Sequence, residues 1–413
     1  MNIQRKDVII VGGGPAGLAA AVELFQRGIH DILIIEREKS LGGILRQCIH
    51  DGFGLTRFHE TLSGPEYAQR FINKVQELGI PYQTDTTVIN IDPNKIVTSV
   101  SKRGVLQYQA KAIILSMGCR ERTRGAISIP GTRPSGIYTA GVAQSYINLN
   151  NKMIGREVVI LGSGDIGLIM ARRLTLEGAK VKAVFEIQPY PNGLPRNVQQ
   201  CLRDYDIPLY LSHTIVDIKG DARLTGVTVA KVDEKLNLIP GTEKDYPCDT
   251  LILSVGLIPE NELSLAAGVD LDRRTKGALV DENYQTDVKG IFAAGNVLHV
   301  HDLVDFVSAE AERTADAVIQ YLLDSKLDKC ERAIKTDNNI IYTIPQKISG
   351  TKNFVLSLRV KHPMKNCEIR INQNGTLKKR ITKRKMLPAN MIQIPINKKI
   401  LDDDADLEVS VKC

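Results

Sequence analysis

Two copies of one glycine-rich unit constrain this chain more than any other feature. In the first copy an apolar run ends at Val11 and leads into Gly12-Gly13-Gly14-Pro15-Ala16-Gly17. In the second, an apolar run ends at Leu161 and leads into Gly162-Ser163-Gly164-Asp165-Ile166-Gly167. The copies lie 150 positions apart, and each continues at that offset with a helical pattern, a glycine, a second apolar run and a glutamate, Glu36 or Glu186. A strand, a glycine turn and a helix in this order indicate a dinucleotide site.

Each landmark of the unit has its own physical reason. Gly12 and Gly162 make the tight turn out of the strand, Gly14 and Gly164 let the backbone approach a pyrophosphate, and Gly17 and Gly167 allow close packing of helix on strand. The helix that follows begins at Pro15-Ala16 or at Asp165 and directs its positive end at the phosphates. Glu36 and Glu186 are placed to accept hydrogen bonds from an adenosine ribose. The alternative is a glycine-rich turn in an ordinary α/β sheet.

Composition agrees with a multidomain globular protein. The 413 residues suit two or three domains, with 43% hydrophobic and 24% charged residues. No apolar run is long enough to span a membrane, and the first strand begins too early for a signal peptide, so we expect a cytoplasmic location. The seven cysteines are widely scattered, without a C-x-x-C pair, which predicts neither a metal site nor a structural disulfide.

The remaining chain completes the predicted domain organisation. An apolar strand ends at Gly118 and a matching one at Gly256, and a further strand ends at Gly295-Asn296 before a helix over about 305–323. From about residue 340 the pattern is all-β, with a hairpin at Asn374-Gly375. The sequence thus predicts an α/β protein with two Rossmann-like domains and a small C-terminal all-β module.

The landmarks resemble those of the flavoproteins with two dinucleotide-binding domains, the group of thioredoxin reductase and the pyridine nucleotide-disulfide oxidoreductases. The resemblance implies FAD in the first unit and a nicotinamide nucleotide in an inserted second unit. It implies a discontinuous FAD domain at 1–121 and 263–335, an NAD(P) domain at 122–262, and the module at 340–413. It also implies that Gly295 and Asn296, where this family usually has Asp, contact the flavin's ribityl-phosphate chain, and that Gly43, Gly118 and Gly256 belong to the cofactor sites.

A narrower resemblance is found in Gly42–Gly54, Leu62–Ala68 and Gly295–Asp305. These segments look like the FAD/NAD oxidoreductases encoded beside anaerobic-type glycerol-3-phosphate dehydrogenases in Firmicutes and Thermotogae. They are also similar to subunits of opine dehydrogenases and hydrogen-cyanide-forming systems. The resemblance implies an NAD-linked enzyme that works with a dehydrogenase subunit in glycerol metabolism. Homo- or hetero-oligomers are both open.

Side chains near the expected flavin carry the remaining hypotheses. Cys48 is either a nucleophile activated by Arg46 and His50 or a buried, inert thiol. His50 is either a proton donor or acceptor or a partner within its loop. His299 and His301 alternate on an extended segment, so they are expected to face opposite sides and to bind no metal without further partners. Asp302 or Asp305 is expected to cap the helix that follows.

Charge is concentrated in the C-terminal module. Residues 340–413 hold 15 Lys/Arg against 6 Asp/Glu, and two basic runs, at 378–380 and 383–385, lie on one predicted strand. No aromatic residue is interleaved with them, which argues against nucleic-acid binding. The strand is either a solvated edge or a docking surface for an acidic partner.

Three functions follow from these features. The first is hydride transfer between NAD(H) and flavin in partnership with a dehydrogenase. NAD is favoured over NADP because Glu186 would repel a 2′-phosphate. The second is a self-sufficient NADH oxidase or peroxidase using Cys48, and the third is a flavin-bearing assembly or sensor subunit with an idle NAD site.

Overall fold

The computed structural model describes residues 3–324, 327–402 and 405–413. Their contacts form two compact units, the first comprising 1–46, 51–119 and 259–413 and the second comprising 47–50 and 120–258. The chain passes from one unit to the other along β7 (Cys119–Glu121) and returns along β16 (Leu257–Pro259), and these two strands pair.

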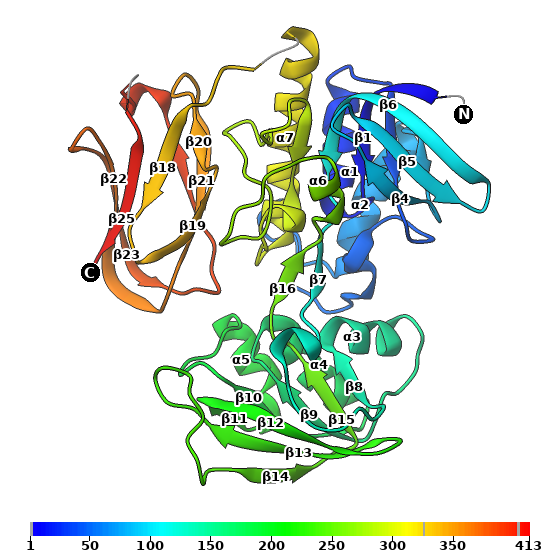
Figure 1. The fold of residues 1–413 in the computed structure, drawn as a ribbon, viewed down its shortest axis with the longest axis vertical. Helices are drawn as coiled ribbons and strands as arrows, with labels where there is room; N and C mark the ends of the chain where they lie inside the picture. The colour runs from blue at the N-terminus through cyan, green and yellow to red at the C-terminus, as the bar shows by residue number, and fades with distance from the viewer. Residues whose placement is uncertain (1–2, 325–326, 403–404) are drawn as a thin grey trace. The chain divides into compact units, whose positions relative to one another are not determined.

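The first unit is built on a seven-stranded sheet (Figure 1). β1 (Ile3–Val11) lies parallel to β2 (Ile32–Ile35) and to β6 (Gly104–Leu115), and β17 (Ile291–Ala293) adds in parallel beside the end of β6. The remaining strands are β3 (Tyr82–Gln83), β4 (Thr87–Ile91) and β5 (Ile96–Ser101). The strand after residue 286 therefore returns to the sheet begun by the first glycine-rich unit, as the sequence predicts.

Side chains alternate across this sheet and bury both of its faces. Val8 and Ile10 pack under the helices α1 (Pro15–Gln26), α2 (Gly64–Glu77) and α7 (Val304–Asp324), and α1 and α7 lie side by side (Figure 1). Ile9 and Val11 face the opposite core, which includes Tyr342 from the C-terminal module. β4 and β5 add to this sheet in antiparallel orientation, and its parallel part, covered on both faces, has the Rossmann-like arrangement.

The second unit repeats this design. β9 (Glu157–Leu161) is central in a five-stranded parallel sheet with β10 (Lys180–Glu186), β11 (Leu209–Leu211), β15 (Thr250–Leu253) and β8 (Ile137–Thr139). Its helices are α3 (Ala140–Asn148), α4 (Asp165–Leu176) and α5 (Pro195–Cys201). A three-stranded antiparallel sheet follows, made of β12 (His213–Gly220), β13 (Leu224–Lys231) and β14 (Lys244–Pro247). The short helix α6 (Glu262–Ala266) belongs to the first unit.

The C-terminal module is a pair of sheets around its own apolar core, as expected. One sheet has the order β20-β18-β25-β22-β23 and the other β19-β21-β24. The strands are β18 (Arg332–Thr336), β19 (Ile340–Ile344), β20 (Lys347–Ile348), β21 (Phe354–Val360), β22 (Met364–Gln373), β23 (Thr376–Met386), β24 (Ile392–Ile396) and β25 (Leu407–Lys412). Asn374 and Gly375 both have positive φ, so they form the predicted hairpin turn between β22 and β23.

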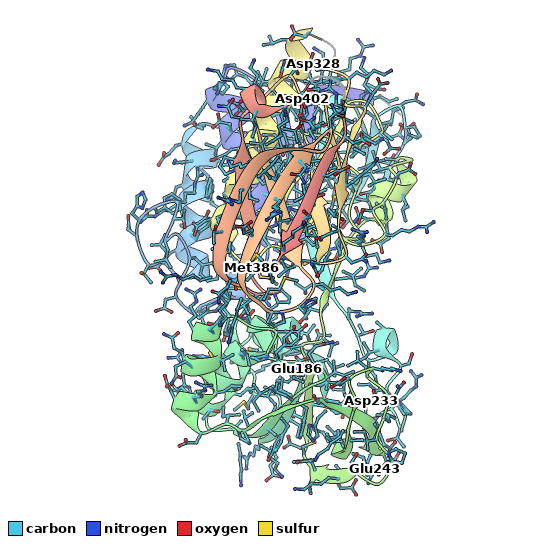
Figure 2. All side chains as sticks on the ribbon, turned by 90° about the vertical axis from the view of Figure 1, so that its left-hand side faces the viewer. Glu186, Asp233, Glu243, Asp328, Met386 and Asp402 are labelled. Atoms are coloured by element: carbon cyan, nitrogen blue, oxygen red, sulfur yellow. A yellow bond between two sulfur atoms is a disulfide. The ribbon has the colours of Figure 1, made fainter. Side chains whose placement is uncertain are left out.

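The basic strand β23 lies at the end of its sheet. Its side chains extend from the region of Asp402, which pairs with Lys378, to Met386 at the strand's end (Figure 2). Lys383, Arg384 and Lys385 are exposed. An exposed strand at the edge of the sheet is compatible with both expectations, a solvated edge and a docking surface.

Among the described residues, no helix is both long and apolar enough to cross a membrane.

Candidate functional site: two dinucleotide loops

The first glycine loop leaves β1 in a conformation that only glycine tolerates well. Gly12 has a φ of +108°, and a Cβ on it would lie 2.4 Å from the carbonyl oxygen of Ser116. A Cβ on Gly17 would lie 1.9 Å from the carbonyl oxygen of Gly12, so this glycine permits the close approach of α1 to the turn. Gly14 differs, because a Cβ there would have no neighbour nearer than the Cα of Gly43, at 3.9 Å.

The second loop has the same construction. Gly162 has a φ of +96°, and its Cβ would lie 2.0 Å from the carbonyl oxygen of Ser254. A Cβ on Gly167 would meet the Ser254 side chain at 2.6 Å. A Cβ on Gly164 would meet the Ser254 hydroxyl at 3.2 Å. In both loops the outer glycines are therefore required by the protein's own packing.

Two buried glutamates bind the loops in the same way. Glu36 is 5% exposed, and its Oε2 accepts a hydrogen bond from the Gly13 N–H at 2.7 Å. Glu186, labelled in Figure 2, is 3% exposed, and its Oε2 accepts from the N–H and the hydroxyl of Ser163 at 2.9 and 2.6 Å. Each carboxylate also accepts a backbone N–H two residues further on. Both carboxylates are thus fixed beside their loops at the ends of β2 and β10.

The helices that follow are open at their N-termini. α1 starts at Pro15 and α4 at Asp165, with Gly14 and Gly164 as N-caps that supply no side-chain hydrogen bond to the helix. In α4 the Gly167 N–H donates to the Ser254 hydroxyl at 3.1 Å, and the other backbone N–H groups of the first turns are the ones that an anion such as a pyrophosphate would use. Two such loops, each with a buried carboxylate, fit two adenine dinucleotides.

Some of the residues predicted to bind the cofactors also contact other parts of the protein. Asp165 Oδ1 accepts hydrogen bonds from the backbone N–H of Leu194 and the amide of Asn197, so it also anchors the start of α5. Ala16 is buried against the predicted ribityl-side residue Gly295, whose Cβ would approach the Ala16 Cβ to 2.9 Å. Gly43 lies against the first loop, where its Cβ would be 2.9 Å from the Cα of Gly14.

The glycines that end the closing strands also adopt positive φ. Gly118 has a φ of +76° and its carbonyl accepts a hydrogen bond from Glu260. Gly256 has a φ of +106° and its carbonyl accepts from Arg122. These turns lie where the chain passes between the units.

Asn296 is held by protein groups. Its Oδ1 accepts a hydrogen bond from the His301 N–H at 3.0 Å, and its Nδ2 lies 3.6 Å from Cys119 Sγ. The Gly295 N–H donates to Glu310 Oε1 at 2.8 Å. Glu310 is fully buried on α7, and it was not among the residues predicted from the sequence. The sequence feature that could have revealed Glu310 is its position on the buried face of this helix, between Val307 and the pair Ala311 and Thr314.

The expectation that His299 and His301 face opposite sides is wrong. The two ring centroids are 4.3 Å apart, and both Nε2 atoms point to Glu310 Oε2, at 2.8 and 3.4 Å. The segment is not extended, because a turn of 3-10 helix (Gly295–Val297) precedes it. Burial lowers the pKa of His299 to about 4.

The expected helix cap is also wrong. Asp302 pairs instead with Arg359 and accepts the Met391 N–H, and Asp305 lies inside the first turn of α7. Local sequence favours an acidic residue before a helix, but the C-terminal module provides the competing partners for Asp302.

Cys48 and His50 lie in the short segment 47–50, which belongs to the second unit. Gln47 donates to the Gly141 carbonyl and to Gln144 of α3, and Cys48 Sγ lies 3.8 Å from Gln144 Oε1. Although part of the residue reaches the surface, protein atoms surround the thiol, and this burial raises the pKa of Cys48 to about 12. The thiol is therefore protonated at neutral pH, which favours the inert alternative.

The expectation of no disulfide is wrong as well. Cys367 and Cys413 form one, with their Cα atoms 4.1 Å apart. The register of β22 with β25 pairs Glu368 with Lys412, so the two cysteines become cross-strand neighbours although they are 46 residues apart. Sequence spacing alone does not reveal such a pair.

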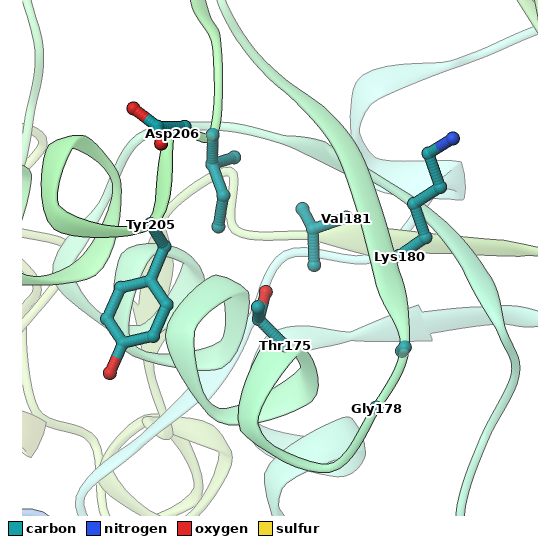
Figure 3. A pocket seen from close by; sticks show the side chains of 8 residues that line it. Thr175, Gly178, Lys180, Val181, Tyr205 and Asp206 are labelled. Carbon is teal, nitrogen blue, oxygen red and sulfur yellow. The ribbon is translucent and has the colours of Figure 1, made fainter.

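A surface cavity of about 380 Å³ lies in the second unit, away from the glycine loop (Figure 3). Thr175, Gly178, Lys180, Val181, Tyr205 and Asp206 surround it, between the end of α4 and the start of β10. Since the glycine loop follows the carboxyl end of β9, which is parallel to β10, this cavity is at the opposite edge of the sheet. It is no part of the dinucleotide site.

Known proteins are similar to this chain in sequence and in fold. A thioredoxin reductase of Listeria monocytogenes is 28% identical over 70% of this chain and 85% of its own length. The HcnB subunit of hydrogen cyanide synthase from Pseudomonas aeruginosa is 26% identical over 71% of this chain and 64% of its own. In structure, thioredoxin reductase from Lactococcus lactis matches 77% of this chain and 99% of its own, with a TM-score of 0.64 and 20% identity.

Residues 6–318 match the family described as pyridine nucleotide-disulphide oxidoreductase. This range includes both glycine loops, both glutamates and the returning strand β17, and it ends before the β module. The chain belongs to that family and is an oxidoreductase that uses FAD and a nicotinamide nucleotide.

Proposed function

We propose that this enzyme transfers hydride between NAD(H) and bound FAD as one subunit of a system with a glycerol-3-phosphate-type dehydrogenase. The single observation that carries the redox part is the repeated geometry of two complete loops, each closed by a buried glutamate. Bound FAD supplies the hydride chemistry, while the chain supplies binding, orientation and electrostatics.

The proposed division of the chain follows from the loops. The FAD domain comprises 1–121 and 263–335, the NAD domain 122–262, and the module 340–413. FAD is assigned to the first loop, through Gly12, Gly14, Pro15-Ala16, Gly17 and Glu36, with Gly43, Gly118, Gly295 and Asn296 completing the site. NAD is assigned to Gly162, Gly164, Asp165, Gly167, Glu186 and Gly256.

The preference for NAD over NADP depends on Glu186. Its carboxylate is buried at the end of β10, where it would meet the ribose of the adenosine half and repel a 2′-phosphate. Replacing it by glutamine removes the charge and keeps the shape. We expect Glu186→Gln to lower the preference for NADH over NADPH by about tenfold, which corresponds to about 1.4 kcal/mol. Steady-state kcat/KM for both nucleotides measures it, and an unchanged ratio would refute the assignment.

A partner subunit is supported by relatives whose names describe them as parts of larger enzymes. The matched range of this chain is similar to the small chain of Escherichia coli glutamate synthase (24% identical) and to HcnB. The chain also lacks a C-x-x-C pair, and the Cys367–Cys413 disulfide lies in the C-terminal module, outside the range 6–318 that matches the family, so dithiol exchange at the flavin is not supported. Electrons from the substrate would therefore reach the flavin through a protein partner. The cytoplasmic location expected from the sequence stays a prediction.

The peroxidase alternative is weaker on this structure. A peroxidase that uses Cys48 needs an accessible thiolate, whereas burial raises the pKa of this thiol to about 12. Packing beside Ser254 requires Gly162 and Gly167 with or without a nucleotide, so titration with NADH is the test of the idle-site alternative.

Anaerobic titration of the purified flavoprotein with NADH tests the proposal. We expect the visible flavin absorbance to bleach with one equivalent of NADH per flavin, and adding glycerol-3-phosphate to the isolated chain to have no such effect. Flavin that stays oxidised with both NADH and NADPH would overturn the proposal in favour of an assembly or sensor subunit. Rapid reoxidation by peroxide that Cys48→Ser abolishes would favour the peroxidase instead.

A further inference from the structure

A cluster of two imidazoles and a carboxylate lies beneath the turn at Gly295. The side chains of His299 and Glu310 have no exposed surface, and that of His301 is 1% exposed. The three residues come from the turn after β17 and from α7, two segments that the fold brings together in the first unit. Each residue offers one ligand atom, and these atoms lie within 4.8 Å of one another.

The donor atoms have the spacing of a metal site. Glu310 Oε2 lies 2.8 Å from His299 Nε2 and 3.4 Å from His301 Nε2. Ligands about 2.0–2.1 Å from a tetrahedral zinc ion are about 3.3 Å apart, which is within about 0.5 Å of both distances from Glu310 Oε2. In addition, His301 Nε2 is buried and makes no well-directed hydrogen bond among the described residues, since its one polar neighbour in those contacts is Glu310 Oε2 at 3.4 Å.

The remaining polar atoms of the cluster have partners that would orient the ligands. His301 Nδ1 lies 3.3 Å from Asn296 Oδ1, and His299 Nδ1 lies 3.4 Å from the Tyr342 hydroxyl. Glu310 Oε1 accepts the Gly295 N–H. Metal-binding histidines commonly donate their second ring N–H in this way, which fixes the ring and leaves the other nitrogen for the metal.

The charge of Glu310 leads to the same conclusion. A fully buried carboxylate needs a cation or several hydrogen bonds. Glu310 Oε1 has one backbone donor, and its Oε2 faces only the two imidazoles in the contacts described. Arg359 donates to the Val300 carbonyl and the Tyr342 hydroxyl beside the cluster, and Arg313 interacts electrostatically with Glu310, but neither guanidinium forms an ion pair with Glu310 in the contacts described. A divalent ion held by neutral imidazoles would supply the positive charge.

We infer that His299, His301 and Glu310 bind one divalent transition-metal ion of the zinc or iron(II) class. Two histidines and one carboxylate form a three-ligand set that both ions accept, with a further position for a non-protein ligand. The inference departs from the expectation of no metal site, because the third ligand, Glu310, lies nine residues beyond His301 on a different element, α7.

Metal analysis of the full chain without a polyhistidine tag tests this site. Protein purified without chelators is expected to contain about one equivalent of zinc or iron by inductively coupled plasma mass spectrometry. His301→Gln and Glu310→Gln should each reduce that content at least tenfold. His362→Gln removes an exposed histidine outside the cluster and should leave it unchanged.

A second measurement uses only the unaltered protein, so it does not depend on whether the variants fold. X-ray absorption at the metal edge should show nitrogen or oxygen ligands at about 2.0–2.1 Å with the outer scattering of imidazole. Protein that contains no metal as isolated, and takes up none from Zn²⁺ or anaerobic Fe²⁺, would overturn the inference. Equal metal content in His301→Gln and the unaltered protein would overturn it too.

Discussion

Gly14 and Gly17 are three positions apart in one loop, yet they are glycines for different reasons. A Cβ at Gly14 has no neighbour within 3.9 Å in the protein, whereas a Cβ at Gly17 would lie 1.9 Å from the Gly12 carbonyl. The space at Gly14 is therefore available to a ligand, and the space at Gly17 is already occupied by the chain. Replacing each by alanine separates cofactor binding from folding.

We expect Gly14→Ala to fold with an unchanged Tm of the apoprotein and to bind FAD at least about tenfold more weakly, a loss of about 1.4 kcal/mol. Gly17→Ala should lower the free energy of unfolding by about 1–3 kcal/mol or more, since its methyl group meets fixed backbone. Gly125→Ala, whose Cβ would be 3.8 Å from the Thr123 hydroxyl, should change neither. Calorimetry of FAD binding and thermal unfolding measure both effects; full FAD affinity in Gly14→Ala would contradict the site.

Cys48 gives a prediction that depends on pH. Burial raises the pKa of its thiol to about 12, so the thiol is protonated below that value and the thiolate fraction grows about tenfold per pH unit toward it. At pH 8, alkylation by iodoacetamide should be roughly a thousandfold slower than for an exposed peptide cysteine. Mass spectrometry of the Cys48 peptide gives the rate. Modification at the rate of the peptide would instead support a reactive thiol.

Residues that belong to a local pattern could be predicted from the sequence, and those defined by tertiary contacts could not. Glu36 and Glu186 follow their glycine loops at a fixed spacing, and both lie against those loops in the structure. Glu310 has no such spacing to His299 and His301. It meets them only because α7 packs beside the turn after β17, and a lone acidic residue in a helical pattern is normally a solvated one.

At the scale of single elements, boundaries followed local chemistry closely. Helix α2 begins at Gly64, just before Pro65, because Ser63 forms a capping box with Glu66 in which each side chain binds the other's backbone N–H. That pattern, a serine three residues before a glutamate, was readable in the sequence. The strands of the β module were harder to place, since their pairing depends on long-range register.

The stability of the β22–β25 strand pair depends on whether Cys367 and Cys413 are oxidised to a disulfide. The Cys367–Cys413 disulfide closes a loop with a sequence separation of 46 residues, and in the chain-entropy view such a link stabilises the folded state by about 4 kcal/mol. We expect Cys413→Ser to lower the free energy of unfolding of the module by about 2–4 kcal/mol. Denaturant unfolding with and without reductant measures it.

Cys201→Ser, at a buried cysteine outside the module that forms no disulfide, is the matched control. Its unfolding should respond to reductant as the unaltered chain does, whereas Cys413→Ser should not respond. Two free thiols at these positions in the oxidised protein, found by intact-mass measurement after alkylation, would contradict the pairing.

On the scale of the whole molecule, the β module is more closely joined to the first unit than the change in sequence pattern at residue 340 indicates. Tyr342 and Ile344 of β19 belong to the core beneath the seven-stranded sheet. The sequence pattern becomes all-β at residue 340, but the hydrophobic core of the sheet includes residues on both sides of that position. The folding of the first unit therefore includes at least the first strands of the module.

Arg359 is the residue through which this continuity can be tested. It is 12% exposed and donates hydrogen bonds to the Tyr342 hydroxyl and to the carbonyls of Val300, Pro388 and Ala389, while it pairs with Asp302. Arg359→Met would leave the 6%-exposed carboxylate of Asp302 without its cation. Breaking a buried pair on one side typically costs about 3–5 kcal/mol.

We therefore expect Arg359→Met to reduce the free energy of unfolding of the first unit by about 3–5 kcal/mol. The control is Arg384→Met, on the exposed edge strand β23, which should change that free energy by less than about 0.5 kcal/mol. Tyr342 belongs to the module and Val300 precedes it in the chain, and Arg359 contacts both. The loss of stability should therefore appear in the module and in the seven-stranded sheet together. Hydrogen exchange of β1 and β21 measures both in one experiment. Faster exchange confined to β21 would show instead that the module folds independently of the sheet.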